Sequence, residues 1–162
     1  MIRHAGLIAR FERGGWRGAL IEGPSGSGKS DLMLRALGEG WRLVADDRVL
    51  VWADDGRIYG RAPAPLAGLI EARGLGVLPA PGRAFAEITL AVVCAPSGEV
   101  ERWPEAARLR LLDLALPQVR IVALEPSAPA KLGRALSHVG LLGQQAYQAA
   151  RGGQGASARG VP

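Results

Sequence analysis

One octapeptide constrains the fold of this chain more than any other stretch. Residues 23–30 fit the pattern G-x-x-x-x-G-K-[ST] at every fixed position. The apolar run of residues 18–22 before it is typical of a buried strand, and the apolar spacing of residues 31–37 after it is typical of a helix. A strand, a glycine-rich loop and a helix form the context in which this pattern binds phosphate. The alternative is a glycine-rich turn that fits by chance, which the two flanking patterns disfavour.

The chemistry of such a loop follows from its residue types. Its glycines let backbone N–H groups turn inward around a polyphosphate, and the helix N-terminus adds a partial positive charge at the same point. In this pattern Lys29 reaches the terminal phosphates, and the hydroxyl of Ser30 ligates Mg²⁺. The predicted nucleotide-binding residues are Gly23, Pro24, Ser25, Gly26, Ser27, Gly28, Lys29 and Ser30.

Composition predicts a globular protein rather than a membrane or secreted one. A chain of 162 residues with 48% hydrophobic residues is typical of one domain with a substantial core. No apolar run reaches the roughly 18 residues of a membrane span, and arginines interrupt the apolar N-terminal residues that a signal peptide needs. The single cysteine, Cys94, lies in an apolar run predicted as a buried strand. These features predict a cytoplasmic protein with no membrane partner.

The net charge of +5 raises the question of a nucleic-acid partner. The arginines are scattered without a dense run, and Lys29 and Lys131 are the two lysines of the sequence. This distribution does not favour a nucleic-acid surface. A basic surface also suits an acidic protein partner or a nucleotide.

Apolar periodicity and turn residues outline the elements. We expect helices near residues 30–38, 66–71 and 131–150, the last with possible breaks at two glycines, and a helix or strand at 106–112. Expected strands cover residues 5–12, 17–22, 42–45, 49–52, 58–61, 87–94 and 119–124. Hairpin signals such as that at residues 54–57 predict a mixed sheet. The predicted fold class is therefore α/β, with a mixed β-sheet core that contains the phosphate loop and is flanked by helices. Residues 1–150 form the predicted domain, and the glycine-rich residues 151–162 a disordered tail.

Three further positions are candidates for a site around the loop. Asp46 and Asp47 follow a predicted strand, where paired acids can hold a metal or accept a proton; the alternative is a solvated turn. Glu71 lies in a region otherwise short of charge and suits a metal ligand, although a solvated helix face is an equal alternative. His4 is near the N-terminus, where an exposed and mobile side chain is the default.

Taken in series, these motifs resemble the catalytic domain of HPr kinase/phosphorylase. The resemblance covers about residues 4–135 and is strongest up to Val77. It rests on the loop at 23–31, the segment 40–49 with its Ala-Asp-Asp sequence, residues 60–63, and residues 70–77 with Glu-x-Arg-Gly-x-Gly. A phosphate loop alone is generic, whereas these motifs in this order are specific. The resemblance implies an HPr kinase/PEP carboxykinase-like fold, with residues 1–150 as the catalytic domain.

The resemblance also implies a role for each matching residue. Asp46 would be the base that takes the proton from the acceptor serine, and His4 would lie beside it and tune it. Asp47 would orient the site, and Arg102 would lie near the transferred phosphate. Lys29 would cradle the β- and γ-phosphates of ATP, while Ser30 and Glu71 would hold Mg²⁺.

The implied function is that of an ATP-dependent protein serine kinase. Its substrate would be HPr or an HPr-like phosphocarrier of the phosphotransferase system, with a reverse phosphorylase reaction as a second activity. The family's hexamers imply a homo-oligomer. Residues 78–118 depart most from the family pattern, in a region expected to form much of the protein-substrate surface. Two alternatives stay open: a phosphate-loop kinase for a small molecule, and a nucleotide-binding regulatory module without transfer activity.

Overall fold

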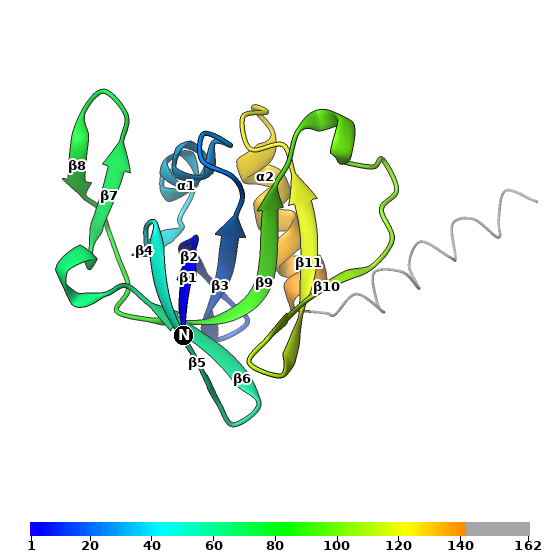
Figure 1. Cartoon of the computed structure of the whole chain (residues 1–162), viewed down its shortest axis with the longest axis horizontal. Coiled ribbons are helices and arrows are strands. Elements are labelled where there is room, and N and C mark those ends of the chain that lie inside the picture. Colours follow the sequence, from blue (N-terminus) through cyan, green and yellow to red (C-terminus); the bar gives the residue numbers. More distant parts are fainter. Residues whose placement is uncertain (142–162) are drawn as a thin grey trace, which may run out of the picture.

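The computed structural model describes residues 1–141, in which a curved mixed sheet is covered on one face by two helices (Figure 1). The predicted tail at 151–162 and the end of the predicted helix at 131–150 lie outside these residues. No helix of the described part is long and apolar enough to span a membrane.

The elements alternate between hairpins and crossovers. The helices are α1 (Lys29–Leu37) and α2 (Ala128–Ala135), which η3 (Leu136–Gly140) continues as a π-helical turn; η1 (Ala64–Leu66) and η2 (Ser97–Glu99) are single 3₁₀ turns. A small two-stranded sheet consists of β7 (Leu69–Ala72) and β8 (Gly76–Pro79). The large sheet contains β1 (Ile2–His4), β2 (Gly6–Glu12), β3 (Gly15–Glu22), β4 (Arg42–Ala45), β5 (Arg48–Asp54), β6 (Arg57–Arg61), β9 (Ala86–Cys94), β10 (Ala107–Leu111) and β11 (Leu114–Ile121).

The strand order explains why the site lies at one end of the large sheet. The order is β1-β5-β6-β9-β3-β2-β4, and β11, with β10 as its hairpin partner, also pairs with β9. Strands β3, β9 and β11 run parallel, while the other pairings are antiparallel. The loops that follow the three parallel strands therefore meet at the same end of the sheet. This arrangement confirms the predicted mixed α/β fold.

Side-chain alternation buries both faces of the central strands. In β2, Ile8 joins the core beneath α1 and α2, whereas its neighbours Leu7 and Ala9 join a second core on the other face. In β3, Ile21 and Leu20 divide between the same two cores. All of these side chains are fully buried. The period-2 pattern of the strands thus produces two hydrophobic cores, one on each side of the sheet.

Two element predictions need correction. Residues 66–71 do not form a helix, because Gly68 takes a positive φ of 75° after η1 and the chain then enters β7. Two more glycines have a positive φ in the β7–β8 hairpin: Gly74 lies in its turn, and Gly76 is the first residue of β8. The last strand begins at Leu114 rather than at residue 119. Its hairpin partner is β10 at residues 107–111, which settles the prediction of a helix or strand at 106–112 in favour of the strand. Pairing of β11 with β9 begins only at residue 118. Pro117 therefore precedes this pairing, where its missing N–H costs no hydrogen bond to β9.

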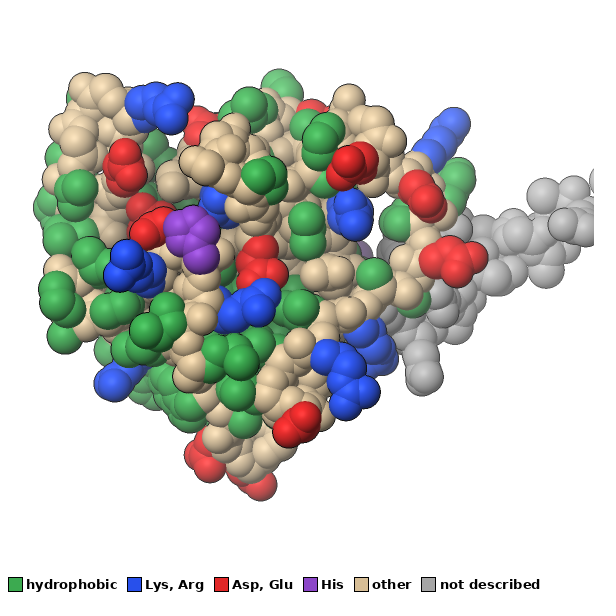
Figure 2. Space-filling model, in the orientation of Figure 1, with side chains coloured by type: hydrophobic (Ala, Val, Ile, Leu, Met, Phe, Trp, Pro, Cys, Tyr) green, Lys and Arg blue, Asp and Glu red, His purple; other side chains and the backbone are tan. Residues whose placement is uncertain are grey.

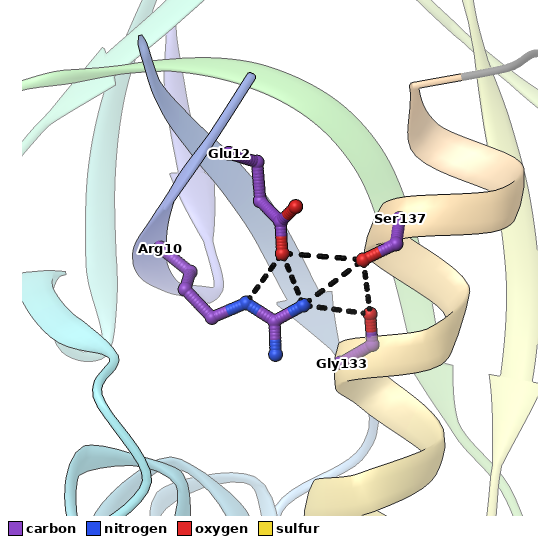
Figure 3. Close-up of polar contacts among 4 residues, drawn as sticks. All are labelled: Arg10, Glu12, Gly133 and Ser137. Atoms are coloured by element: carbon purple, nitrogen blue, oxygen red, sulfur yellow. Dashed lines mark hydrogen bonds and ion pairs between the residues drawn. The ribbon is translucent and has the colours of Figure 1, made fainter. Parts of the chain in front are cut away.

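A polar network fixes α2 to the far end of β2 (Figure 3). Arg10 donates to Glu12 through Nε at 2.8 Å, and through Nη2 to the carbonyl of Gly133 and the hydroxyl of Ser137, both at 3.0 Å. Ser137 in turn donates to the same Glu12 carboxylate at 3.2 Å. The guanidinium also lies over the ring of the buried Trp41, 5.2 Å from its centroid. The network holds the helix against the strands that flank the site.

Candidate active site

The loop at residues 23–28 connects the end of β3 to the start of α1, in the predicted strand–loop–helix arrangement. Gly28 caps the helix in a left-handed conformation with φ 91°, and Leu32 donates to its carbonyl at 2.9 Å. A Cβ atom at Gly28 would lie only 2.8 Å from Cδ2 of Leu124. Glycine is therefore required here both by the backbone angle and by the close approach of the loop after β11.

Lys29 lies across the mouth of this loop. Its ammonium donates to the carbonyl oxygens of Gly23 at 2.8 Å and Pro24 at 3.1 Å. These carbonyl oxygens are neutral acceptors. A phosphate oxygen can replace them, because its negative charge makes it a stronger acceptor for the ammonium. The lysine is thus placed to contact a polyphosphate bound by the loop.

Cys94 packs beneath the start of the loop. A Cβ atom at Gly23 would lie 3.0 Å from both Cβ and the carbonyl oxygen of Cys94. Burial raises the pKa of the Cys94 thiol to about 11, although the charge of Lys29 and the nearby Ser27 hydroxyl act to lower it. The thiol is buried, as predicted, and stays protonated at neutral pH.

Asp46 joins the three sequence motifs. It follows β4, and its Oδ1 accepts from the hydroxyl of Ser30 at 3.3 Å. Its Oδ2 accepts from the backbone N–H of Glu71, in β7, at 2.9 Å. One carboxylate therefore connects the phosphate loop, the Ala-Asp-Asp segment and the Glu-x-Arg-Gly-x-Gly segment, which lie far apart in the sequence.

His4 lies next to Asp47 rather than next to Asp46, which differs from the partner that the resemblance implies. Its Nδ1 is 3.2 Å from Oδ1 of Asp47, while Arg48 approaches the same carboxylate at 3.9 Å. The cause is the register of β1 on β5, which pairs His4 with Arg48 directly after the turn. Asp47 has a φ of 67°, and its carbonyl accepts from the N–H of Ala5 at 3.1 Å. Both side chains are more than half exposed, so this pair contributes little to stability.

Arg102 stands apart from the other predicted residues. It lies in the exposed segment between η2 and β10. Within residues 1–141 it forms no hydrogen bond or ion pair with the remaining predicted site residues. The structure thus brings together the loop, both aspartates, His4 and Glu71, but not Arg102.

Sequence reasoning missed Arg35, which fixes the loop after β11. Its guanidinium donates to the carbonyl of Glu125 at 3.1 Å, also to that of Ala123, and pairs with Asp31 at 2.8 Å. Glu125 of the same loop also pairs with Lys131 of α2 at 2.5 Å. The spacing of Asp31 and Arg35, four residues apart on a predicted helix, was the available signal, but it indicates only a helix-surface pair. Nothing local reveals the carbonyl partners about ninety residues away.

The oxygen groups around Asp46 fit Mg²⁺. The described residues contain no cluster of three or more acidic, histidine or cysteine side chains. Mg²⁺ prefers one or two protein oxygens together with water and phosphate oxygens, so such a cluster is not needed. The Ser30 hydroxyl and the exposed Glu71 carboxylate are a donor set of this kind. Asp46 holds both residues in place, through the hydroxyl of Ser30 and the backbone N–H of Glu71.

The surface of this face is mixed in charge. Figure 2 shows acidic, basic and histidine side chains near the middle of the face, and hydrophobic side chains gathered at the end where Figure 1 shows β7 and β8. Leu75, Val77 and Leu78 of this hairpin region are exposed at 73%, 62% and 37%. Charged groups thus lie beside an exposed apolar hairpin on this face.

Comparisons with known proteins agree on one family. A family model described as the HPr Serine kinase C-terminal domain matches residues 4–85. Over 129 residues the chain is 33% identical to the HPr kinase/phosphorylase of Enterococcus faecalis, an alignment that covers 72% of this chain and 39% of that protein. The protein of the same name from Lacticaseibacillus casei is 33% identical over 132 residues, with 74% and 39% covered.

Other matches are shorter or more distant in sequence. The HPr kinase/phosphorylase of Clostridium beijerinckii is 46% identical over 61 residues, which are 38% of this chain and 20% of that protein. The chain thus spans two fifths or less of the length of these curated relatives. The solved structure of the Hpr(Ser) kinase/phosphatase from Coxiella burnetii superposes with a TM-score of 0.73 at 20% identity, covering 84% of this chain and 93% of that one. This match shows a shared fold.

Proposed function

Because the chain belongs to the family of HPr Serine kinase C-terminal domains, we propose that it is an ATP-dependent protein serine kinase acting on HPr or an HPr-like phosphocarrier. The observation that carries the proposal is the position of Asp46. Its carboxylate is bonded to the Ser30 hydroxyl at the end of the phosphate loop, so a base stands next to the place where the terminal phosphate would lie. A cytoplasmic location and a homo-oligomeric state belong to the same proposal.

The proposed reaction uses the residues in separate roles. The acceptor serine oxygen attacks the γ-phosphorus as the bond to the β–γ bridging oxygen breaks, and Asp46 takes the serine proton. The carboxylate can do so because its two present partners, the Ser30 hydroxyl and the Glu71 N–H, are both donors and leave lone pairs free. ADP and the phosphoserine are the products. In the phosphorylase reaction, an oxygen of inorganic phosphate attacks the phosphoserine phosphorus, the protonated Asp46 returns its proton to the departing serine oxygen, and the products are pyrophosphate and the free serine.

Charge relief is the second requirement of phosphoryl transfer. Lys29 would exchange its carbonyl partners for the β- and γ-phosphate oxygens, and the N–H groups of residues 26–30 would face the same oxygens. Ser30 and Glu71 would hold Mg²⁺, which supplies further neutralisation of the phosphate oxygens when bound. Asp47 would orient the acceptor segment, and we expect Arg102 to approach the phosphate only if its segment moves.

The substrate class is tested by following labelled phosphate. The purified chain is incubated with γ-labelled ATP, Mg²⁺ and an HPr protein, and in parallel with an HPr variant whose acceptor serine is alanine. We expect label on the serine of the first protein and none on the second. Label found only on a small metabolite would identify a small-molecule kinase instead. Tight ATP binding without transfer to either class would identify a regulatory module.

A further inference from the structure

We propose that the nucleoside of the phosphoryl donor binds on the β11 side of the loop, against Leu124 and in the cavity between α2 and the segment after β9. This inference rests on the proposed function for the identity of the donor. It adds a specificity-determining residue, Leu124, and a location for the base and ribose that the motifs of the sequence do not indicate.

The topology leaves one side of the loop for the nucleoside. The loops that follow the parallel strands β3, β9 and β11 share one end of the sheet. On the β2 side of β3, the site is closed by Asp46, with Ser30 and Glu71 bonded to it. That side must also admit the acceptor serine. A nucleotide with its terminal phosphate near Asp46 therefore extends in the other direction, toward the loops after β9 and β11.

Leu124 stands where such a nucleotide leaves the phosphate loop. Its side chain packs against Gly28, with Cδ2 2.8 Å and Cγ 3.0 Å from the position of an added Cβ, yet 64% of the residue is exposed. A large apolar side chain held at a phosphate loop and left open to solvent offers a platform for a base or ribose. Arg35 fixes this platform through the carbonyls of the residues on both sides of Leu124.

A cavity of about 910 Å³ is lined by Ile121 and Ser127, which stand on either side of the loop that carries Leu124. Its walls are the segment after β9, strand β11 and the exposed face of α2, and its volume is within the roughly 300–1,000 Å³ of small-molecule pockets. Apolar groups such as Val100 and Ala130 lie beside the polar groups of Glu99, Arg120 and Ser127. The lining also contains the basic side chains Lys131, Arg134 and His138, so apolar surface for the faces of a nucleoside stands beside both donors and acceptors for its hydrogen-bonding edges.

The test separates the nucleoside from the phosphates. Dissociation constants are measured for ATP and for inorganic tripolyphosphate, each with Mg²⁺, on the wild-type chain and on Leu124→Ala. Because Leu124 is exposed, its replacement leaves the core intact, which a thermal unfolding curve verifies. We expect Leu124→Ala to weaken ATP binding about 5- to 20-fold, the loss of one apolar contact, and to leave tripolyphosphate binding unchanged.

Phe11→Ala is the matched control, since Phe11 is 58% exposed and lies near the β2–β3 turn, at the opposite end of β3 from the loop. It should change neither constant. Unchanged ATP binding in Leu124→Ala would overturn the proposal, and so would an equal loss for tripolyphosphate, which would assign Leu124 to the shape of the loop. Phosphorylation of the carrier at saturating ATP is measured beside these constants, so that failure of this inference is distinguished from failure of the proposed function.

Discussion

At the scale of single residues, the site depends on contacts between groups that are far apart in the sequence. Asp46 accepts from Ser30 and from the backbone of Glu71, and Gly28 packs against Leu124. The octapeptide pattern is sufficient to predict the loop because its glycines and lysine have fixed local roles. It is not sufficient to predict Leu124 or Arg35, because their roles depend on which loop the topology places beside the glycine.

Cys94 allows a test of how tightly the floor of the loop is packed. Burial raises its pKa from 9.0 to about 11, so the folded protein holds the thiol proton more tightly than the unfolded chain does. The contribution of this group to the free energy of unfolding is therefore present below pH 9 and is lost as the pH rises toward about 11. We expect wild type to lose more stability than Cys94→Ala between pH 8 and roughly pH 10.5.

Denaturant unfolding of both proteins across this pH range measures the difference. The Cys94→Ala variant is the control, because it contains all the other groups that titrate in this pH range. Parallel stability curves for the two proteins would show that the thiol is not shielded. Rapid labelling of the folded wild type by a thiol reagent at neutral pH would contradict the same account.

At the scale of elements, the strands that are marked by apolar runs could be predicted, and the short irregular ones could not. Residues 42–45 and 87–94 have patterns that local sequence determines, and β4 and β9 follow them within a residue. Residues 69–72 pair with β8, and this pairing, rather than their own helical spacing, sets their conformation. Strand β1 was not expected, because three residues at the terminus become a strand only through their pairing with β5.

The network at Arg10 determines how firmly α2 is held, and its removal should be costly. Arg10 and Glu12 are only 27% and 20% exposed, so Arg10→Ala leaves a largely desolvated carboxylate and the Gly133 carbonyl without this donor. We expect a loss of about 2 kcal/mol in the free energy of unfolding. The exposed Arg61→Ala serves as the control and should stay within roughly 0.5 kcal/mol of wild type.

Coupling within this network can be measured separately. A double-mutant cycle with Ser137→Ala should give an interaction free energy of at least about 0.5 kcal/mol, because both side chains share the Glu12 carboxylate. Strict additivity of the two substitutions would show that the contacts drawn in Figure 3 do not act together.

At the scale of the whole molecule, the mixed sheet places two functions on opposite sides of one loop. The antiparallel strands β2 and β4 bring Asp46 to the side where an acceptor serine would enter, and the parallel strands β9 and β11 build the side assigned here to the nucleoside. The family motifs in the sequence predict the first side, since they contain its residues. The second side is formed by residues 95–139, from which the sequence predicts only Arg102 as a site residue, and only the folded arrangement shows a cavity.

The central claim is that Asp46 is the base of a carrier kinase, and Asp46→Asn tests it most directly. Asparagine keeps the size of the side chain and can still accept from Ser30 or Glu71, but it cannot take a proton. The rate of phosphate transfer from ATP to the serine of HPr is measured at saturating ATP, together with the dissociation constant for ATP. We predict a rate at least about 100-fold lower with ATP affinity within a few-fold of wild type. A variant that transfers phosphate to HPr at the wild-type rate would contradict the account.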